Sequence, residues 1–385
     1  MKEHAGEDPA RFLLHSKLER EKAGFVANQL AGRKEAREKY PSLLKYPQFV
    51  FPPHLNRQQS SSEATARYKA SLLQEGLNIV DITGGFGIDD LFLAEKAKRV
   101  LRIEKEGPLN AIAEWNALQT GRREKVQSIC ADSMEWLCHT REHFDLLYVD
   151  PARRNEAGRK VASLADCTPN VLPLLPRLFE VADRLLVKAS PMVDIKKATE
   201  ELGCVDEVHV VEWKGECKEV LFLCGREERH HSTRRIFTII GDEGDARVKK
   251  DYGVEEETVA VTVFATEMKR YVYEPSPAPM KAGCFKLLCW WYGVEKLAPA
   301  THLYTSDRCV ADFPGRVFEV IRAVKPKEIK AVIPSGRANV LCRNYPVTSA
   351  ALANQYNLKD SNSLTIVATT LAQHRCMWLC RSVFH

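Results

Sequence analysis

The sequence lacks any long hydrophobic run and any export signal. No apolar stretch approaches the ~18 residues that a membrane-spanning helix requires. The first 24 residues contain no apolar core and no cleavage site, so no secretory signal is expected. Hydrophobic residues make up 45% of the chain, as is usual for a soluble globular protein. These absences predict a cytoplasmic protein that does not bind membranes.

The twelve cysteines lack the spacing of a metal site or of a disulfide framework. No C-x-x-C pair occurs, and the closest pair is Cys376 with Cys380. Cys224 ends an apolar run, where a cysteine behaves as a small buried hydrophobe. The tandem His230 and His231 have no partner at ligand spacing and are expected to be exposed linker residues. We therefore expect a reducing compartment and no metal.

Neither sign of charge dominates the composition. Lysine and arginine total 56 and acidic residues 51, which gives a net charge of +5 and a pI near 8.5. This mild excess is compatible with a nucleic-acid partner but does not require one. A chain of 385 residues exceeds the size at which a single core stays undivided, so two or three domains are expected.

One stretch in the first third of the chain has the order of elements found in nucleotide-binding folds. The β-branched run Leu77–Ile82 predicts a buried parallel strand. In the turn Thr83–Gly87 that follows, glycines let the backbone approach a ligand, although such a turn can also serve chain geometry alone. Apolar spacing over Ile88–Ala97 predicts a helix, and Arg99–Ile103 predicts a strand that leads to Glu104. An acid about 20 residues after the glycines completes a nucleotide-binding βαβ pattern.

The glycine spacing argues against a dinucleotide. The G-x-G-x-x-G fingerprint places its third glycine at the helix start, whereas the glycines here are Gly84, Gly85 and Gly87. Asp81 precedes the turn, and its carboxylate would repel a pyrophosphate but attract a cationic ligand. S-adenosylmethionine is such a ligand, since it combines a sulfonium and an ammonium with ribose hydroxyls.

Further strands place more acids at the same edge. Ligands of parallel sheets bind outside the carboxyl ends of the strands. Asp81, Glu104, Asp132 and Asp150 each end a predicted strand, so four carboxylates are expected to face one crevice. The later strands of this sheet are predicted at Val126–Cys130, Phe144–Val149, Arg184–Val187, Val205–Trp213 and Glu219–Cys224.

Several motifs carry a family resemblance. DITGGFG, RIE, ADS and DPARR resemble the motif series of class I S-adenosylmethionine-dependent methyltransferases. Together with QQSSSEATARYKA, KASPM, LYTSD, FPGRVF and IPSGRANVLCRNYP, they resemble a bacterial methyltransferase family with a THUMP-like C-terminal domain. The resemblance covers nearly the whole chain. Its sheet motifs are general to the superfamily, and its C-terminal motifs are specific to the family.

The resemblance implies an α/β protein with a Rossmann-like class I methyltransferase sheet, an N-terminal helical cap and a C-terminal α+β region. We expect a helical N-terminal domain over residues 1–75 and the S-adenosylmethionine-dependent methyltransferase domain over 76–228. A ferredoxin-like domain is expected over 232–315 and a THUMP-like domain over 316–385. Ser62 is expected to cap a helix before the first strand, where Ser62, Thr65 or Lys69 either line the site or belong to a plain linker helix.

The strand ends supply a hypothesis for the cofactor site. Asp81 and the glycine turn would hold the methionine part, Glu104 the ribose hydroxyls and Asp132 the adenine amino group. The predicted cofactor-binding residues are Asp81, Thr83, Gly84, Gly85, Phe86, Gly87, Glu104, Lys105, Asp132, Ser133 and Asp150.

The acceptor side of the site is assigned to the residues after the fourth and fifth strands. Asp150, Pro151 and Arg153 are the predicted catalytic residues, and Arg154, Lys188 and Ser190 the predicted substrate-binding residues. Surface pairing with carboxylates is the alternative role for the two arginines. The turn after the fifth strand has no cysteine, so methylation of pyrimidine carbon-5 through a covalent adduct is not expected. A base nitrogen or a ribose oxygen fits better.

The C-terminal half reads as α+β, with strands expected at Arg235–Ile240, Thr258–Ala265, Ala300–Thr305, Val317–Ile321, Lys327–Ile333 and Ser363–Thr370. Tyr273–Met280 is expected to be a proline-stiffened connector and Lys281–Tyr292 a helix. Basic residues near the C-terminus would either contact RNA phosphates or prevent an exposed strand edge from pairing with another chain. They are Lys325, Lys327, Lys330, Arg337 and Arg343.

The predicted function is methylation of structured RNA, tRNA or rRNA, with S-adenosyl-L-methionine as cofactor and RNA as partner. Two other classes stay open. A non-catalytic RNA-binding protein could keep the fold as a scaffold, although a scaffold would not need the strand-end acids. A small-molecule or protein methyltransferase would rarely need the helical cap and the large C-terminal region.

Overall fold

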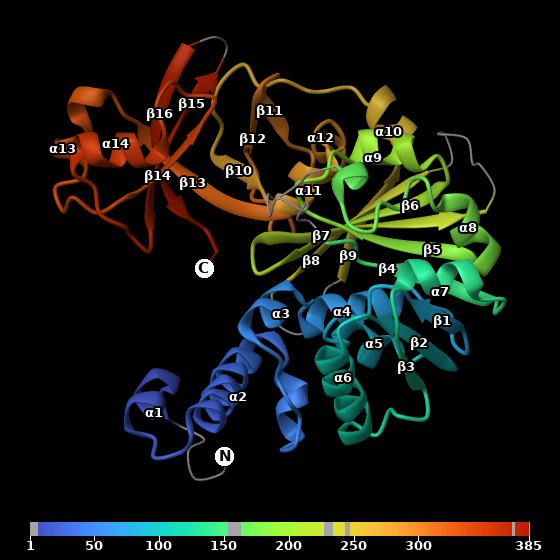
Figure 1. Ribbon diagram of the computed structural model, residues 1–385. Coiled ribbons are helices and arrows are strands. Elements are labelled where there is room, and N and C mark those ends of the chain that lie inside the picture. The colour runs from blue at the N-terminus through green and yellow to red at the C-terminus, as the bar shows by residue number, and fades with distance from the viewer. Residues whose placement is uncertain (1–6, 153–162, 227–233, 243–246, 372–373, 385) are drawn as a thin grey trace. The chain divides into compact units, whose positions relative to one another are not determined.

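The computed structural model describes residues 7–152, 163–226, 234–242, 247–371 and 374–384 (Figure 1). They fall into two compact units, one ending at Val248 and the other starting at Lys249. His230 and His231 lie outside the described residues. Within the described ranges, no helix combines the length and the apolar character needed to cross a bilayer.

The first unit contains a nine-stranded sheet with the order β3-β2-β1-β4-β5-β7-β6-β8-β9, except that most of the last strand, β9, follows the residue at which the units divide. Strands β1 to β5 are parallel neighbours, and β7 runs antiparallel to both β5 and β6. This order confirms the Rossmann-like class I methyltransferase sheet. The strands are β1 (Asn78–Asp81), β2 (Arg99–Glu104), β3 (Val126–Cys130), β4 (Phe144–Val149), β5 (Ala182–Ala189), β6 (Val205–Trp213), β7 (Glu216–Gly225), β8 (Arg235–Gly241) and β9 (Arg247–Gly253).

The N-terminal segment that precedes β1 shares a hydrophobic core with this sheet. Tyr40, Phe49 and Phe51 are each at most 1% exposed and pack in one core with Phe86 of the glycine turn. A fully buried side chain of this size contributes about 1.5–3 kcal/mol, so the N-terminal segment is anchored where the turn begins. The helices are α1 (Pro9–His15), α2 (Arg20–Lys39), η2 (Pro41–Lys45), α3 (His54–Gln59), α4 (Glu63–Ser71), α5 (Ile88–Leu93), α6 (Gly107–Gln119), α7 (Ser133–His139), η3 (Leu164–Asp166), α8 (Leu175–Val181) and α9 (Ile195–Leu202).

Helix α4 begins as its sequence predicts. The Ser62 hydroxyl accepts a hydrogen bond from the backbone N–H of Thr65, which satisfies one of the unpaired donors of the first turn. The helix packs against α5 and directs Lys69 into the protein, where this lysine is fully buried.

The second unit contains a seven-stranded sheet with the order β11-β12-β10-β13-β16-β15-β14. Its strands are β10 (Tyr271–Pro275), β11 (Glu295–Ala298), β12 (Thr301–Ser306), β13 (Gly315–Ala323), β14 (Asn339–Arg343), β15 (Leu364–Leu371) and β16 (His374–Ser382). Its helices are α10 (Val254–Val259), α11 (Pro277–Ala282), α12 (Leu287–Tyr292), η5 (Pro326–Glu328), α13 (Ile329–Val332) and α14 (Ser349–Tyr356).

Two of the strands predicted in the second unit are wrong. Over Thr258–Ala265 the chain completes α10 and then runs irregularly, with only an isolated bridge at Phe264. Over Lys327–Ile333 the chain forms η5 and α13. Ile329 and Ile333 are buried there, whereas Ala331 between them is exposed. In a strand all three would share one face, so the burial pattern is that of a helix.

Two further expectations in the second unit need correction. The helix predicted over Lys281–Tyr292 is two short helices, because Gly283 adopts φ +83° and ends α11. The connector predicted over Tyr273–Met280 is instead the end of β10 followed by α11. Proline at the start of α11 does not break the helix, because the first turn needs no N–H donor there.

Candidate functional site

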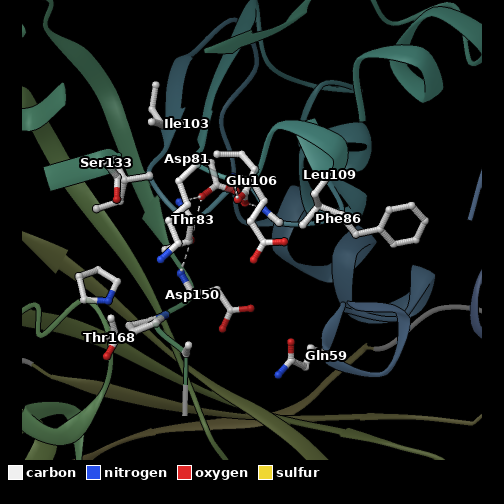
Figure 2. Close-up of a pocket in the computed structure, with 18 of the residues that line it drawn as sticks. Gln59, Asp81, Thr83, Phe86, Ile103, Glu106, Leu109, Ser133, Asp150 and Thr168 are labelled. Carbon is white, nitrogen blue, oxygen red and sulfur yellow. Dashed lines mark hydrogen bonds between the residues drawn. The ribbon is translucent and has the colours of Figure 1, made fainter. Parts of the chain in front are cut away.

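A pocket of about 750 Å³ opens at the carboxyl ends of β1, β2, β3 and β4 (Figure 2). All four predicted strand-end acids line it, namely Asp81, Glu104, Asp132 and Asp150. The α3 end and the loop after it supply further wall, including Gln59 and Ser61. This volume lies within the range of about 300–1,000 Å³ usual for small-molecule sites.

The glycine turn is shaped by a buried arginine beneath it. Arg102 of β2 is fully buried and donates to the Gly85 carbonyl at 2.7 Å, to Asn110 Oδ1 at 2.8 Å and to Asp90 Oδ2 at 3.1 Å. A Cβ on Gly84 would lie 2.8 Å from the Arg102 guanidinium, and Gly87 has φ +82°. These two glycines are therefore required by the fold itself, in addition to any ligand.

The Asp81 side chain lies beside the glycine turn and is only 2% exposed. Its Oδ1 accepts from the Thr83 N–H at 2.6 Å and from the Thr83 hydroxyl at 2.9 Å. Burial, with a further contribution from Asp90, raises the pKa of Asp81 well above its ordinary value. Burial also raises the pKa of Asp90 to about 6, although Arg102 opposes the shift. A cationic ligand group beside Asp81 would favour its ionised form.

Thr83 joins the ends of two neighbouring strands. Its Oγ1 donates to Asp81 and accepts from the backbone N–H of Asp150 at 2.8 Å, as the dashed lines in Figure 2 show. This link fixes the backbone of Asp150 against the glycine turn. Figure 2 shows Asp150 and Gln59 facing the same open space in the pocket.

Glu104 is held in place at the end of β2. Its Oε2 accepts from the Gly85 N–H at 2.7 Å and its Oε1 from the Glu106 N–H at 2.8 Å. Each carboxylate oxygen retains a further lone pair for a ligand. A fixed carboxylate of this kind suits a pair of ligand hydroxyl groups.

The remaining predicted cofactor residues lie around the same pocket. Asp132 caps α7 through Oδ1, which accepts from the Met134 N–H at 2.8 Å, so Oδ2 is the oxygen left to a ligand. Ser133 and Lys105 line the pocket beside it. The Phe86 ring packs against Tyr40, with 6.1 Å between the ring centroids, and belongs to the core.

The predicted acceptor-side residues divide into two groups. Asp150 and Pro151 line the pocket, whereas Arg153 and Arg154 lie outside the described residues. Lys188 is 7% exposed and is not part of the pocket wall, but its Nζ lies 2.5 Å from Asp150 Oδ2. Ser190 caps a turn by accepting from the Met192 N–H at 3.2 Å and does not line the pocket.

A buried ionic cluster that sequence reasoning largely missed lies behind the Asp150 end of the pocket. Lys69 Nζ lies 2.6 Å from Glu219 Oε1 and 3.2 Å from Asp89 Oδ1. Asp89 Oδ2 accepts from Ser61 Oγ at 2.8 Å and from the Tyr148 hydroxyl at 2.9 Å. Asp89 and Glu219 come from elements far apart in sequence, and charged residues inside otherwise apolar segments were the only available signal.

The charges in this cluster act on one another. Although burial alone would raise the pKa of Asp89, Lys69 and Lys188 bring it below its ordinary value. Although burial alone would lower the pKa of Lys188, the carboxylates of Asp150 and Glu219 raise it, so Lys188 is an ammonium. Burial raises the pKa of Glu219 against the opposing effect of Lys69.

Metal ligands were not predicted, and among the described residues no group of three or more His, Cys, Asp or Glu side chains could hold an ion. The carboxylates in the pocket fit S-adenosylmethionine. A fixed carboxylate at Glu104 matches vicinal hydroxyls, and the buried carboxylate at Asp81 matches a cationic end.

Comparison with protein families gives two matches in the second unit. Residues 271–314 match a ferredoxin-like domain, and residues 315–382 match a THUMP domain-like family. No curated protein compared with the chain matches it.

Among solved structures, a proposed methyltransferase from Porphyromonas gingivalis W83 is 31% identical, with a TM-score of 0.87. The match covers 100% of this chain and 96% of that one. A proposed RNA methyltransferase from Pyrococcus horikoshii is 16% identical over 48% of this chain and 95% of that one, with a TM-score of 0.35. TrmK from M. capricolum, in complex with S-adenosylhomocysteine, is 11% identical over 43% of this chain and 68% of that one, with a TM-score of 0.34.

The sheet order, the strand-end acids, the THUMP-like match and the full-length similarity to the P. gingivalis protein agree with one another. The chain belongs to the family of class I S-adenosylmethionine-dependent methyltransferases that carry a THUMP-like C-terminal domain.

Proposed function

We propose that the protein transfers a methyl group from S-adenosylmethionine to structured RNA. The observation that carries the proposal is the convergence of four strand-end carboxylates on one pocket, beside a buried ionic cluster. A protein that used the sheet only as a scaffold would have no reason to keep the buried charges of this set, Asp81, Lys69 and Glu219, since burying charges opposes folding.

The cofactor side of the pocket is assigned as follows. Glu104 binds the ribose hydroxyls, because its carboxylate is held by two backbone N–H groups. Asp132 Oδ2 accepts from the adenine amino group, with Ser133 and Lys105 beside it. Asp81 and the turn of Thr83, Gly84, Gly85, Phe86 and Gly87 hold the methionine end. A charge-assisted hydrogen bond in such a site contributes about 1.5–3 kcal/mol.

The acceptor side is assigned to Asp150, Pro151, Arg153 and Arg154. The cofactor supplies an electrophilic methyl group, and the chain's residues position the acceptor and exclude water. Asp150 contacts the acceptor, Pro151 stiffens the loop and the two arginines bind phosphate or base. Lys188 acts through Asp150, since its ammonium is buried against that carboxylate, and Ser190 shapes the turn after β5.

Charge distribution supports RNA as the substrate. Residues 315–382 contain ten lysines and arginines and only three acidic residues, although the whole chain has a net charge of only +5. Lys325, Lys327, Lys330 and Arg337 are exposed. A region with this excess attracts a polyanion and gives little advantage with a neutral small molecule.

The test is to follow labelled methyl groups from S-adenosylmethionine into cell fractions from a strain that lacks the gene. RNA should acquire label, and protein and small-molecule fractions should not. Label that enters protein or a small molecule alone would contradict the RNA assignment and favour another methyltransferase class. Cofactor binding without label in any fraction would favour a non-catalytic role.

A further inference from the structure

We infer that the acceptor atom is a hydroxyl oxygen, and specifically the 2′-hydroxyl of an RNA ribose. The inference rests on the proposed function and narrows it to one acceptor. The geometry behind it is the arrangement of two lysines and two carboxylates that join the acceptor end of the pocket to the protein interior. They are Lys69, Asp150, Lys188 and Glu219.

Each of these residues comes from a different element. Lys69 lies on α4, Asp150 directly follows β4, Lys188 lies in β5 and Glu219 in β7. Because β7 is antiparallel to β5, with Ala189 opposite Val220, Glu219 reaches the same edge of the sheet as Asp150. The fold therefore brings together groups that are more than 140 residues apart in the chain, as in the pair of Lys69 and Glu219.

Each of the two lysines donates a hydrogen bond to a residue that lines the pocket. Lys188 Nζ donates to Asp150 Oδ2 at 2.5 Å, and the Asp150 side chain is 33% exposed, so it presents a carboxylate to the cavity. Lys69 Nζ donates to Ser61 Oγ at 3.1 Å, and Ser61 lines the cavity. Asp89 completes the wall between them through its hydrogen bonds to Ser61 and Tyr148.

Stability does not explain the arrangement. Replacing a buried ionic cluster by packed hydrophobic residues is often neutral or stabilising. Lys69 is 0% exposed, Glu219 2% and Lys188 7%, so the cluster opposes folding unless it serves the site. Clustered buried charges at a pocket wall are typical of groups that handle protons.

The part of the pocket that the structure describes has no exposed aromatic ring of the kind that often stacks a flipped base. Enzymes that modify a base usually stack it between aromatic or other apolar side chains. In the described lining of the pocket the aromatic residues are Phe86 and Tyr148, which are 5% and 1% exposed and belong to the core. Residues 150–178, which include the loop after β4, contain no Phe, Tyr or Trp. Among the described lining residues, no exposed aromatic ring is available to stack a base, which favours a ribose acceptor over a base.

A hydroxyl acceptor needs the chemistry that this cluster provides. As the C–O bond forms to the methyl carbon, the methyl–sulfur bond breaks and its electron pair stays on sulfur. The hydroxyl proton passes to the Asp150 carboxylate and then to water. The Lys188 ammonium, paired with Asp150, stabilises negative charge that develops on the oxygen, and the carboxylate of Glu219 favours the charged form of Lys188. Lys69 holds Glu219 and the wall residue Ser61 in position. Asp150 is the catalytic residue in this scheme, and the other three are positioning residues.

The experiment is nucleoside analysis of RNA methylated by the full-length protein. RNA from a strain that lacks the gene is incubated with protein and S-adenosylmethionine, digested and analysed by mass spectrometry. The expected product carries the methyl group on the ribose fragment, with an unmodified base. Methyl on a base would overturn this inference and leave RNA methylation standing. Absence of methyl from RNA, with cofactor binding intact, would overturn both the proposed function and this inference.

Variants of Lys188 and Glu219 distinguish a positioning role in catalysis from a role in folding. Lys188→Met should lower kcat by about 100-fold or more, leave the affinity for S-adenosylhomocysteine within threefold and be partly rescued in Lys188→Arg. Lys196→Met, which changes an exposed lysine on α9, is the matched control and should keep full activity. Equal loss of cofactor affinity and activity in Lys188→Met, or no better activity in Lys188→Arg, would contradict the assigned role. Glu219→Gln gives a second test with nearly unchanged volume and should lower kcat in the same way.

Discussion

The two units of the protein differ in where the charges of their proposed sites lie. In the first unit, Lys69 and Arg102 are fully buried, and each pairs with a carboxylate that is at most 3% exposed in its side chain. In the second unit, Lys325, Lys327, Lys330 and Arg337 are exposed. Arg343, also predicted in that basic group, is exposed as well, and it pairs with the buried Glu274 at 2.5 Å.

Buried and exposed charges suit different functions. Buried charges keep fixed positions and act strongly over short distances, which suits a site that binds a small cofactor and moves a proton. Exposed charges are screened by salt and act together on a polyanion. We therefore expect substitutions in the first unit to change stability or cofactor affinity, and substitutions in the second unit to change the salt dependence of RNA binding.

The largest expected effect comes from Arg102. Arg102→Met removes the partner of the fully buried Asp90 and the support of the Gly85 carbonyl. Leaving a buried charge uncompensated costs about 3–5 kcal/mol, measured as a fall in the free energy of unfolding in urea. Arg99→Met is the matched control on the same strand, because Arg99 is 32% exposed and pairs with an exposed glutamate. Similar losses in both variants would remove the distinction between buried and exposed charge.

The next effect tests the cofactor side of the pocket. Glu104→Gln keeps the size of the side chain but removes its charge, and it should weaken binding of S-adenosylhomocysteine about 10- to 100-fold. Calorimetric titration measures the change. Glu124→Gln alters an exposed glutamate outside the pocket and should bind like the wild type. Unchanged affinity in Glu104→Gln would show that Glu104 does not contact the cofactor.

The exposed charges of the second unit are tested by salt dependence. If Lys327 and Lys330 each contact a phosphate, the double variant Lys327→Ser/Lys330→Ser should reduce the slope of log K against log salt by about 2. Cofactor affinity should stay the same. Lys98→Ser changes an exposed lysine of the first unit and should leave the slope unaltered. An unchanged slope in the double variant would move the RNA surface away from η5 and α13.

The smallest effect concerns an exposed charge in the first unit. Hydrogen bonds to Asp183 and to the Glu180 carbonyl raise the pKa of His143 above its ordinary value of 6.5. The stabilisation is therefore fully present below pH 6.5 and is lost as pH rises through the higher folded-state pKa. His143→Gln should lose less than about 1 kcal/mol at pH 6, because the pair is exposed, and nothing at pH 9. Urea unfolding at both pH values checks the sign, and a larger loss at pH 9 would contradict it.

The sequence predicted the first unit better than the second for a physical reason. Strands such as Val126–Cys130 and Phe144–Val149 match their predicted bounds, because apolar parallel strands are separated by clear turn signals. The second unit has short helices and mostly antiparallel strands. The sequence Lys327–Ile333 fits both a strand and a helix pattern, and only the burial of its side chains in the structure identifies it as helical.

The candidate site was predicted to the extent that its residues end strands. Asp81, Glu104, Asp132 and Asp150 could be placed together because parallel strands share an edge. Glu219 could not be, since its place depends on the antiparallel register of β7 beside β5. From the sequence, Arg102 could be assigned only to a strand. Its position under the glycine turn follows from packing, which sequence patterns do not reveal.

The most direct test of the account is a calorimetric titration of the wild-type protein with S-adenosylhomocysteine at low and high salt. The pocket formed by buried and backbone-held carboxylates predicts saturable binding at one site, with affinity that changes less than about tenfold between 50 and 300 mM salt. RNA binding measured in parallel should weaken steeply over the same range. Absence of saturable binding, or tighter binding of a nicotinamide dinucleotide, would contradict the account.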